Sequence, residues 1–371
     1  MELFNKSRCV YLNVILSLLV IVACNPQETS IAPATVTSSN TPVLTIHPTI
    51  IQEATSTLDP YYRLHEFQNI SISPDGEMMA VSAIYGMRVY DLNTKSLIYS
   101  YEYDPVSRQH TGSYTRIAWS SNNQYLAIGT LGEGVRIWRI SPWDLETEIL
   151  VDTQMAPRPW THPGFEWSPD GNQLVLSVLT AWDHDEDRAI LGRVLIWDSA
   201  SNTWENIYDG EVINVTWWDN GQIVIMLEGR MVDITSGDQK TIVESEHFHL
   251  FSTVVWSPDE RYFCHSFEMG GGIFDIERQI WIGKGCYPPF AWSIDGRYFA
   301  TIFRNTDGVR SMDTISIWNS IDDSVDIIEV PINTIFSLAW SPQDELFALG
   351  VKDESIYLWN NRTDEIVLEI E

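Results

Sequence analysis

A short hairpin pattern recurs seven times along the chain and constrains the fold more than any other feature. Each copy places an aromatic or branched apolar residue before a turn such as Ser-Pro-Asp-Gly, between two short alternating apolar segments. A turn of this composition typically joins two antiparallel strands. The copies begin, at intervals of about 36 to 50 residues, at Ile72, Trp119, Trp167, Trp218, Trp256, Trp292 and Trp340. Repetition at this period predicts an array of similar β-sheets.

The segment that follows each hairpin resembles the third strand of WD40 repeats. The closest versions are residues 134–138, 189–198, 314–319 and 353–360, with weaker ones at 87–91, 230–233 and 272–275. Residues 110–120 also resemble the lead of such a repeat into its first strand. The resemblance covers roughly residues 61–371 and implies four antiparallel strands per repeat. We therefore predict an all-β fold, a seven-bladed WD40-like β-propeller formed by residues 60–371.

Neighbouring blades are expected to stabilise each other, because a four-stranded sheet alone cannot bury both of its faces. The aromatic residue before each turn is predicted to pack between blades, with Ile72 in that place in the first blade. Both residues 62–67 and residues 366–370 are typical of an outer strand. We predict that 366–370 completes the last blade and that 62–67 lies beside the first or the last blade.

The N-terminal residues have the pattern of an export signal. Lys6 and Arg8 precede an apolar run at residues 10–22, which is too short to span a membrane comfortably. The run ends in Ile-Val-Ala-Cys at 21–24, which resembles the bacterial lipobox and implies cleavage after Ala23 and lipid attachment to Cys24. An ordinary signal peptide or an uncleaved anchor is the alternative.

Residues 24–59 are rich in Thr, Ser and Pro and predict a disordered tether. The expected organisation is therefore a signal peptide at 1–23, the tether at 24–59 and the propeller at 60–371. Together these features predict a protein that is lipid-anchored to a bacterial cell membrane or outer membrane and faces the periplasm or the cell exterior.

Two cysteines, Cys264 and Cys286, fall in neighbouring repeats of the predicted propeller. An exported protein meets an oxidising environment, where a disulfide between them would persist. The Cα separation that such a bond requires cannot be read from the sequence. Two separate buried thiols are the favoured interpretation, and the disulfide stays open.

Composition and motifs limit the classes of function. The formal net charge of −29 repels phosphate backbones, so nucleic acid is not expected as a partner. The sequence contains no Gly-x-Ser-x-Gly nucleophile elbow, no His-Glu-x-x-His motif and no Gly-rich phosphate loop. We therefore predict neither an enzyme nor a bound cofactor.

If the chain is divided into WD40-like repeats, its longest predicted loops all emerge on one face of the propeller. These loops are residues 103–112, 152–163, 180–192 and 304–313. This face carries the loops between the second and third strands of a blade and those between blades. Loops extended on one face of a rigid scaffold are typical of recognition. The candidate partner-binding residues are Trp160, His162, Trp182, Asp183, Asp185, Tyr287 and Arg304. We predict a monomeric scaffold that binds an unknown protein or peptide there.

One alternative is that Trp160 and Trp182 fold back onto blade edges. Another is a propeller that binds a small molecule, glycan or metal ion at the mouth of the central channel, with catalysis as one version.

Two groups of side chains have the spacing of metal ligands. Asp183, Asp185 and Asp187 alternate as in calcium-binding loops, but the glycine and the bidentate glutamate of such loops are missing. A solvated acidic loop is the preferred interpretation. His247 and His249, with Glu244 and Glu246, have a spacing that suits zinc, but no Cys or further His nearby completes a site. We therefore predict no metal.

Overall fold

The computed structural model describes residues 67–370 with short gaps, at 84–85, 103–115, 131–133, 151–163, 184–187, 219–220, 238, 246–252, 268–269, 287, 305–309, 331–334, 343–345, 352–354, 361–362 and 364. Residues 1–66 lie outside the described part, so the signal peptide, the lipidation of Cys24 and the tether remain predictions. Within the described part, no helix is long and apolar enough to cross a membrane.

The described chain forms seven four-stranded antiparallel sheets, called blades 1 to 7, and sequence neighbours pair within each. Blade 1 contains β1 (Phe67–Ile72), β2 (Met78–Ala83), β3 (Gly86–Asp91) and β4 (Ser96–Glu102). Blade 2 contains β5 (Arg116–Trp119), β6 (Tyr125–Thr130), β7 (Gly134–Ile140) and β8 (Trp143–Leu150). Blade 3 contains β9 (Phe165–Trp167), β10 (Gln173–Asp183), β11 (Arg188–Asp198) and β12 (Thr203–Gly210). Blade 4 contains β13 (Asn214–Trp218), β14 (Gln222–Leu227), β15 (Arg230–Asp233) and β16 (Lys240–Glu244).

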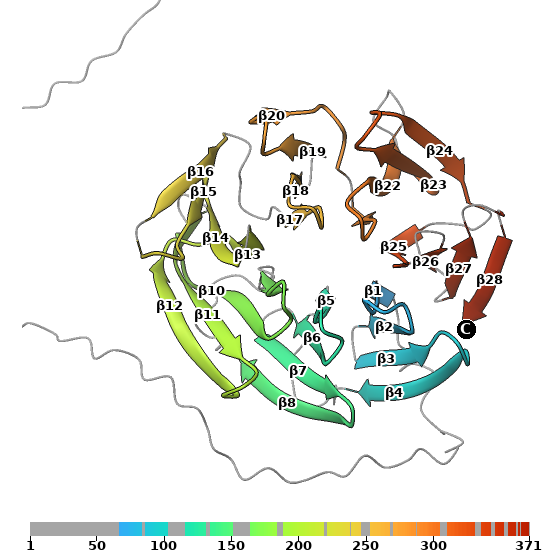
Figure 1. Ribbon diagram of the computed structural model, residues 1–371, viewed down its shortest axis with the longest axis horizontal. Helices are drawn as coiled ribbons and strands as arrows, with labels where there is room; N and C mark the ends of the chain where they lie inside the picture. Colours follow the sequence, from blue (N-terminus) through green and yellow to red (C-terminus); the bar gives the residue numbers. More distant parts are fainter. Residues whose placement is uncertain are drawn as a thin grey trace, which may run out of the picture. The chain divides into compact units, whose positions relative to one another are not determined.

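The remaining three blades repeat this arrangement. Blade 5 contains β17 (Thr253–Trp256), β18 (Tyr262–Phe267), β19 (Gly270–Asp275) and β20 (Ile280–Trp281). Blade 6 contains β21 (Phe290–Trp292), β22 (Tyr298–Arg304), β23 (Arg310–Asn319) and β24 (Val325–Glu329). Blade 7 contains β25 (Ile335–Trp340), β26 (Leu346–Val351), β27 (Ile356–Asn360) and β28 (Glu365–Ile370). The blades stand in a ring with their last strands outside (Figure 1). The predicted seven-bladed propeller with four antiparallel strands per blade is confirmed.

The ring closes between blade 7 and blade 1. The Ile70 backbone N–H donates a hydrogen bond of 3.0 Å to Ser337 Oγ, across 267 residues of sequence. Apolar side chains of both blades form one buried cluster there, which includes Ile70 and Leu358. β28 pairs with β27 as the outer strand of blade 7, which confirms the prediction for residues 366–370. Of residues 62–67 only Phe67 is described, as the first residue of β1.

The Ser-Pro-Asp-Gly turns are held by the same small hydrogen-bond network in several blades. In blade 3, Ser168 Oγ donates to Asp170 Oδ1 at 2.6 Å and accepts from the Gln173 backbone N–H at 2.9 Å. Gly171 adopts a φ of 72°, a left-handed conformation that glycine tolerates best. Equivalent serine-to-aspartate bonds start at Ser73, Ser257 and Ser293. The recurrent motif is therefore a turn whose own side chains satisfy its backbone.

Replacing the buried serine of one turn tests this account. We expect Ser168→Ala to lower the free energy of unfolding by about 1–2 kcal/mol, because the Gln173 N–H loses its acceptor and the Asp170 carboxylate loses one of its donors. Urea denaturation monitored by tryptophan fluorescence measures the change. Ser201→Ala, at an exposed turn of the same blade, is the matched control, and an equal loss in both variants would contradict the account.

Each pair of neighbouring blades encloses its own apolar cluster, so the core of the propeller is seven clusters rather than one. In three interfaces a tryptophan indole N–H also donates to a backbone carbonyl of the preceding blade's inner strand. These bonds run from Trp119 to Ser71, from Trp167 to Ala118 and from Trp217 to Glu166, at 2.9–3.0 Å. The predicted packing of the repeat aromatics between blades is confirmed.

In blade 4 the residue equivalent to the other repeat tryptophans is Trp217, not Trp218 as the sequence pattern suggested. Trp217 is buried opposite Ile223, whereas Trp167 lies opposite Leu174, so the turn of blade 4 is one residue shorter. Trp218 therefore stands at the position of the turn serine. It also packs between blades, but against the next one, where it stacks on Trp256 with ring centroids 6.1 Å apart.

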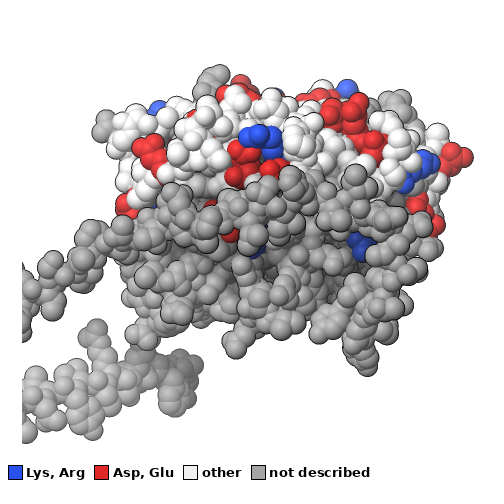
Figure 2. Space-filling view, turned by 90° about the horizontal axis from the view of Figure 1, so that it is seen from below, with Lys and Arg blue, Asp and Glu red and all other residues white. Residues whose placement is uncertain are grey.

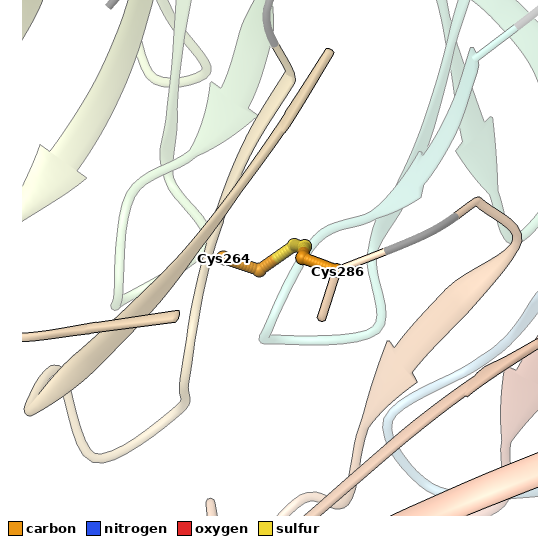
Figure 3. Close-up of a disulfide and its surroundings, with 2 residues drawn as sticks. All are labelled: Cys264 and Cys286. Carbon is orange, nitrogen blue, oxygen red and sulfur yellow. A yellow bond between two sulfur atoms is a disulfide. The ribbon is translucent and has the colours of Figure 1, made fainter. Parts of the chain in front are cut away.

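Cys264 and Cys286 form a disulfide, so the favoured interpretation of two separate thiols is wrong (Figure 3). Their Cα atoms lie 6.0 Å apart, within the range that a disulfide requires. Cys264 is on β18 and Cys286 lies in the segment that leads to β21, and both are fully buried between blades 5 and 6. Only the packing of two blades brings these positions together.

Candidate functional site

Most of the predicted partner-binding residues fall in the gaps of the described chain. Trp160, His162, Asp185 and Tyr287, as well as the weak metal candidate Asp187, lie outside the described residues. Trp182 and Asp183 lie at the end of β10, and Arg304 lies at the end of β22, where the backbone alone is described. On the loop face, the structure therefore describes mainly the ends of the strands that lead into the loops.

Blade 3 extends further toward the loop face than most blades do. β10 and β11 have eleven residues each, whereas the second and third strands of blades 1, 2, 4, 5 and 7 have four to seven. β9 pairs with β10 only as far as Leu176, and β12 pairs with β11 only as far as Gly192. Beyond these points residues 179–183 and 188–192 pair with each other, and within the described residues only Gly192 among them also pairs with β12. We call this two-stranded extension the blade 3 ribbon.

The blade 3 ribbon combines an exposed apolar side chain with a fixed base. Leu191 is 51% exposed, although it lies within a strand. Gly192 holds the base close to blade 4, because a Cβ there would lie 2.9 Å from the Val178 carbonyl oxygen and would also meet the Val212 side chain. Trp182 pairs with Ala189, and Asp183 pairs with Arg188. Trp182 and Asp183, which are neighbours in the sequence, thus both lie on the blade 3 ribbon.

Blade 6 has a smaller extension of the same kind. β23 has ten residues, and Arg304 of β22 pairs with Arg310 after an irregularity in the register. β21 pairs with β22 only as far as Thr301, and β24 pairs with β23 only as far as Thr314. The predicted residue Arg304 therefore sits on a second extended hairpin, three blades away from Trp182.

A polar cluster that the sequence interpretation missed lies at the inner edges of blades 2, 3 and 4. It consists of Arg116 on β5, Glu166 on β9 and Thr216 on β13, each on the first strand of its blade. The Thr216 hydroxyl donates a short hydrogen bond to Glu166 Oε2. The Arg116 guanidinium lies 5.3 Å from the centre of the Phe165 ring. Glu166 itself could have indicated this cluster in the sequence, because other blades have an alanine at the equivalent position of the first strand. These alanines are Ala118, Ala291 and Ala339.

Burial controls the protonation of this cluster. It raises the pKa of Glu166, and the Arg116 charge and the Thr216 hydrogen bond offset only part of that effect. Burial also lowers the pKa of Arg116, which the charge of Glu166 partly offsets. The carboxyl group of Glu166 is thus held in a setting that favours its neutral form, beside a guanidinium that has lost part of its hydration.

The described residues contain no group of three or more His, Cys, Asp or Glu side chains that could hold a metal ion. His247, His249, Asp185 and Asp187 lie outside that part of the chain, so the metal interpretations stay untested there. The chain has 51 acidic and 22 basic side chains. On the coloured surface in Figure 2 the carboxylates form several separate groups with basic side chains among them. This distribution is typical of a solvated acidic surface rather than of one binding patch.

Comparisons with known proteins agree with the fold. Residues 103–139 match the family model of the WD domain, G-beta repeat. A search of the curated proteins found no match.

Two of the similar solved structures illustrate how far the likeness extends over the chain. The Cps50 (Swd1) β-propeller domain of Myceliophteria thermophila is 15% identical and covers 80% of this chain and 98% of its own, with a TM-score of 0.57. Hydrazine synthase of Kuenenia stuttgartiensis is 17% identical and covers 84% and 99%, with a TM-score of 0.55. Likeness at this identity shows the shared propeller fold and nothing about the function.

Proposed function

We propose that this seven-bladed propeller of WD40-like repeats is a non-catalytic scaffold that binds a protein or peptide through its loop face. WD40 propellers commonly act as interaction scaffolds. The observation that carries the proposal is the blade 3 ribbon, which projects on that face beyond the four-stranded sheet. Trp160, His162, Trp182, Asp183, Asp185, Tyr287 and Arg304 are the proposed contact residues.

The geometry of the blade 3 ribbon favours an extended peptide over a small molecule. Within the described residues the ribbon pairs with β12 at Gly192 alone and with β9 at no residue, so its free edges offer backbone N–H and C=O groups to an added strand. Leu191 supplies an apolar contact beside those groups. Backbone pairing provides affinity and side-chain pockets provide specificity in such complexes, so no catalytic group is required.

We further propose that the propeller works outside the cytoplasmic membrane, attached through a lipid on Cys24. The Cys264–Cys286 disulfide supports this location, because disulfides persist in oxidising compartments. The lipobox-like residues 21–24 and the Thr- and Ser-rich residues 24–59 supply the anchor and the tether of the proposal.

Site-specific photo-crosslinking tests the binding face. A photoreactive amino acid is placed at Leu191 on the blade 3 ribbon, or at Ala200, which is exposed at the opposite end of the same blade. In intact cells we expect a discrete protein adduct from position 191 and not from position 200. An equal adduct from both positions, or one from position 200 alone, contradicts the proposed face.

A single substitution then measures the contribution of the exposed leucine. We expect Leu191→Asp to weaken binding of the crosslinked partner at least about tenfold, because a charge replaces an apolar contact at the centre of the interface. The melting temperature is expected to change little, since the side chain is half exposed in the free protein. Titration by calorimetry gives the affinity, and Ile207→Asp on the outer strand of the same blade is the control.

A further inference from the structure

The outer strand of blade 5 is shorter than the outer strands of the other blades. Its outer strand β20 has two residues, whereas the outer strands of the other six blades have five to eight. After β20, two further backbone hydrogen bonds in the described part of the chain keep it beside β19. They run from the Ile282 N–H to the Ile273 carbonyl at 3.0 Å, and from the Ile273 N–H to the Lys284 carbonyl at 3.3 Å. The outer side of blade 5 therefore has few regular strand contacts.

The inner attachment of blades 5 and 6 also differs from that of the first blades. Trp119, Trp167 and Trp217 each donate a hydrogen bond to the preceding blade. The indole N–H groups of Trp256, Trp292 and, in blade 7, Trp340 are buried and have no hydrogen-bond partner within the described part of the chain. Each of the three interfaces from blade 4 to blade 7 thus lacks one directional contact, and a buried donor without a partner destabilises the packed state.

The Cys264–Cys286 disulfide lies at the interface between blades 5 and 6 (Figure 3). Cys264 pairs with Val255 and Ile273, at the position that Ala127 and Ala300 occupy in other blades. That position faces the next blade, so a cysteine there reaches the segment that enters blade 6. The ion pair of Lys284 Nζ with Asp323 Oδ1, at 3.0 Å, is a second link between the same two blades.

We propose that this disulfide is a redox-sensitive link that holds blade 5 against blade 6, and that the ring opens at this interface when the disulfide is reduced. A dithiol reductant supplies two electrons and two protons, so that Cys264 and Cys286 become thiols and the reductant becomes a disulfide. Both half-cystines are fully buried, so the reductant reaches a sulfur only after the interface has opened locally. The rate of reduction therefore reports the opening.

Hydrogen exchange of the folded protein, with and without dithiothreitol, tests the proposal. We expect reduction to raise amide exchange at least about tenfold in residues 262–292, while β6 and β10 in blades 2 and 3 change little. The melting temperature is expected to fall by about 5 to 10 °C, because a loop of 22 residues is no longer closed. Thiol labelling followed by mass spectrometry shows that the bond has been reduced.

The double variant Cys264→Ala/Cys286→Ala is the matched control. Alanine is the residue that other blades carry at the position of Cys264. The amides of the variant should exchange as fast as those of the reduced protein, and adding the reductant should not change their rates. If the variant does not fold, the reduced wild-type protein is measured alone. Uniform exchange over all blades, unchanged exchange after complete reduction, or a disulfide that resists dithiothreitol in the folded protein would each overturn the proposal.

Discussion

Trp167→Ala is expected to lower the free energy of unfolding by about 3–5 kcal/mol. The indole is buried between blades 2 and 3, where it stacks on Tyr125 with ring centroids 5.8 Å apart. Its N–H donates to the Ala118 carbonyl oxygen at 2.9 Å. The substitution therefore leaves a cavity in the interface and a carbonyl oxygen without its donor. Both effects act against the packed state.

Denaturant unfolding with fluorescence and circular dichroism measures this loss. Leu97→Ala on the outer strand of blade 1 is the control, because that side chain is 47% exposed and its loss should change stability by no more than about 0.5 kcal/mol. Trp167→Phe should recover part of the loss, since a ring refills the cavity without the hydrogen bond. A loss of stability in Trp167→Ala as small as that in the control would contradict the proposed role of Trp167 in packing blade 2 against blade 3.

Glu166→Gln is expected to stabilise the protein increasingly as the pH rises. Burial raises the pKa of Glu166 above its ordinary value of 4.5, so the folded state binds this proton more tightly than the unfolded state does. For such a group the stability of the wild-type protein falls as pH increases from the unfolded pKa to the raised folded pKa. Glutamine has the shape of the protonated side chain, can still accept the Thr216 hydrogen bond and cannot ionise.

The measurement is the difference in unfolding free energy between Glu166→Gln and wild type across a pH series. We expect a difference near zero below the unfolded pKa, a rise through the window and a plateau above the raised pKa. Many other carboxylates titrate in this acidic chain, and the difference removes their contribution. Glu205→Gln on the exposed outer strand of the same blade is the control for the loss of one carboxylate at the surface. A difference for Glu166→Gln that stays flat or falls as pH rises contradicts the burial effect.

The amino-acid sequence by itself determined the number and kind of the local elements. Ser168, Asp170 and Gly171 form a turn through contacts between residues two to five positions apart, so the hairpin follows from local chemistry. Seven such turns, each between alternating apolar segments, predicted seven sheets, and the same periodicity placed the closing strand at the C-terminus.

Tertiary structure decided everything that depends on contacts between blades. The shorter turn of blade 4 exchanges the roles of Trp217 and Trp218, and the sequence shows two adjacent tryptophans without saying which one faces the preceding blade. Cys264 and Cys286 meet only because blade 6 packs on blade 5. Glu166 becomes a partly buried acid with a raised pKa because blades 2 and 4 place Arg116 and Thr216 beside it, each about 50 residues away in the sequence. Local patterns specify strands and turns through near neighbours, whereas burial, register between blades and cross-blade distances arise only when the ring has closed.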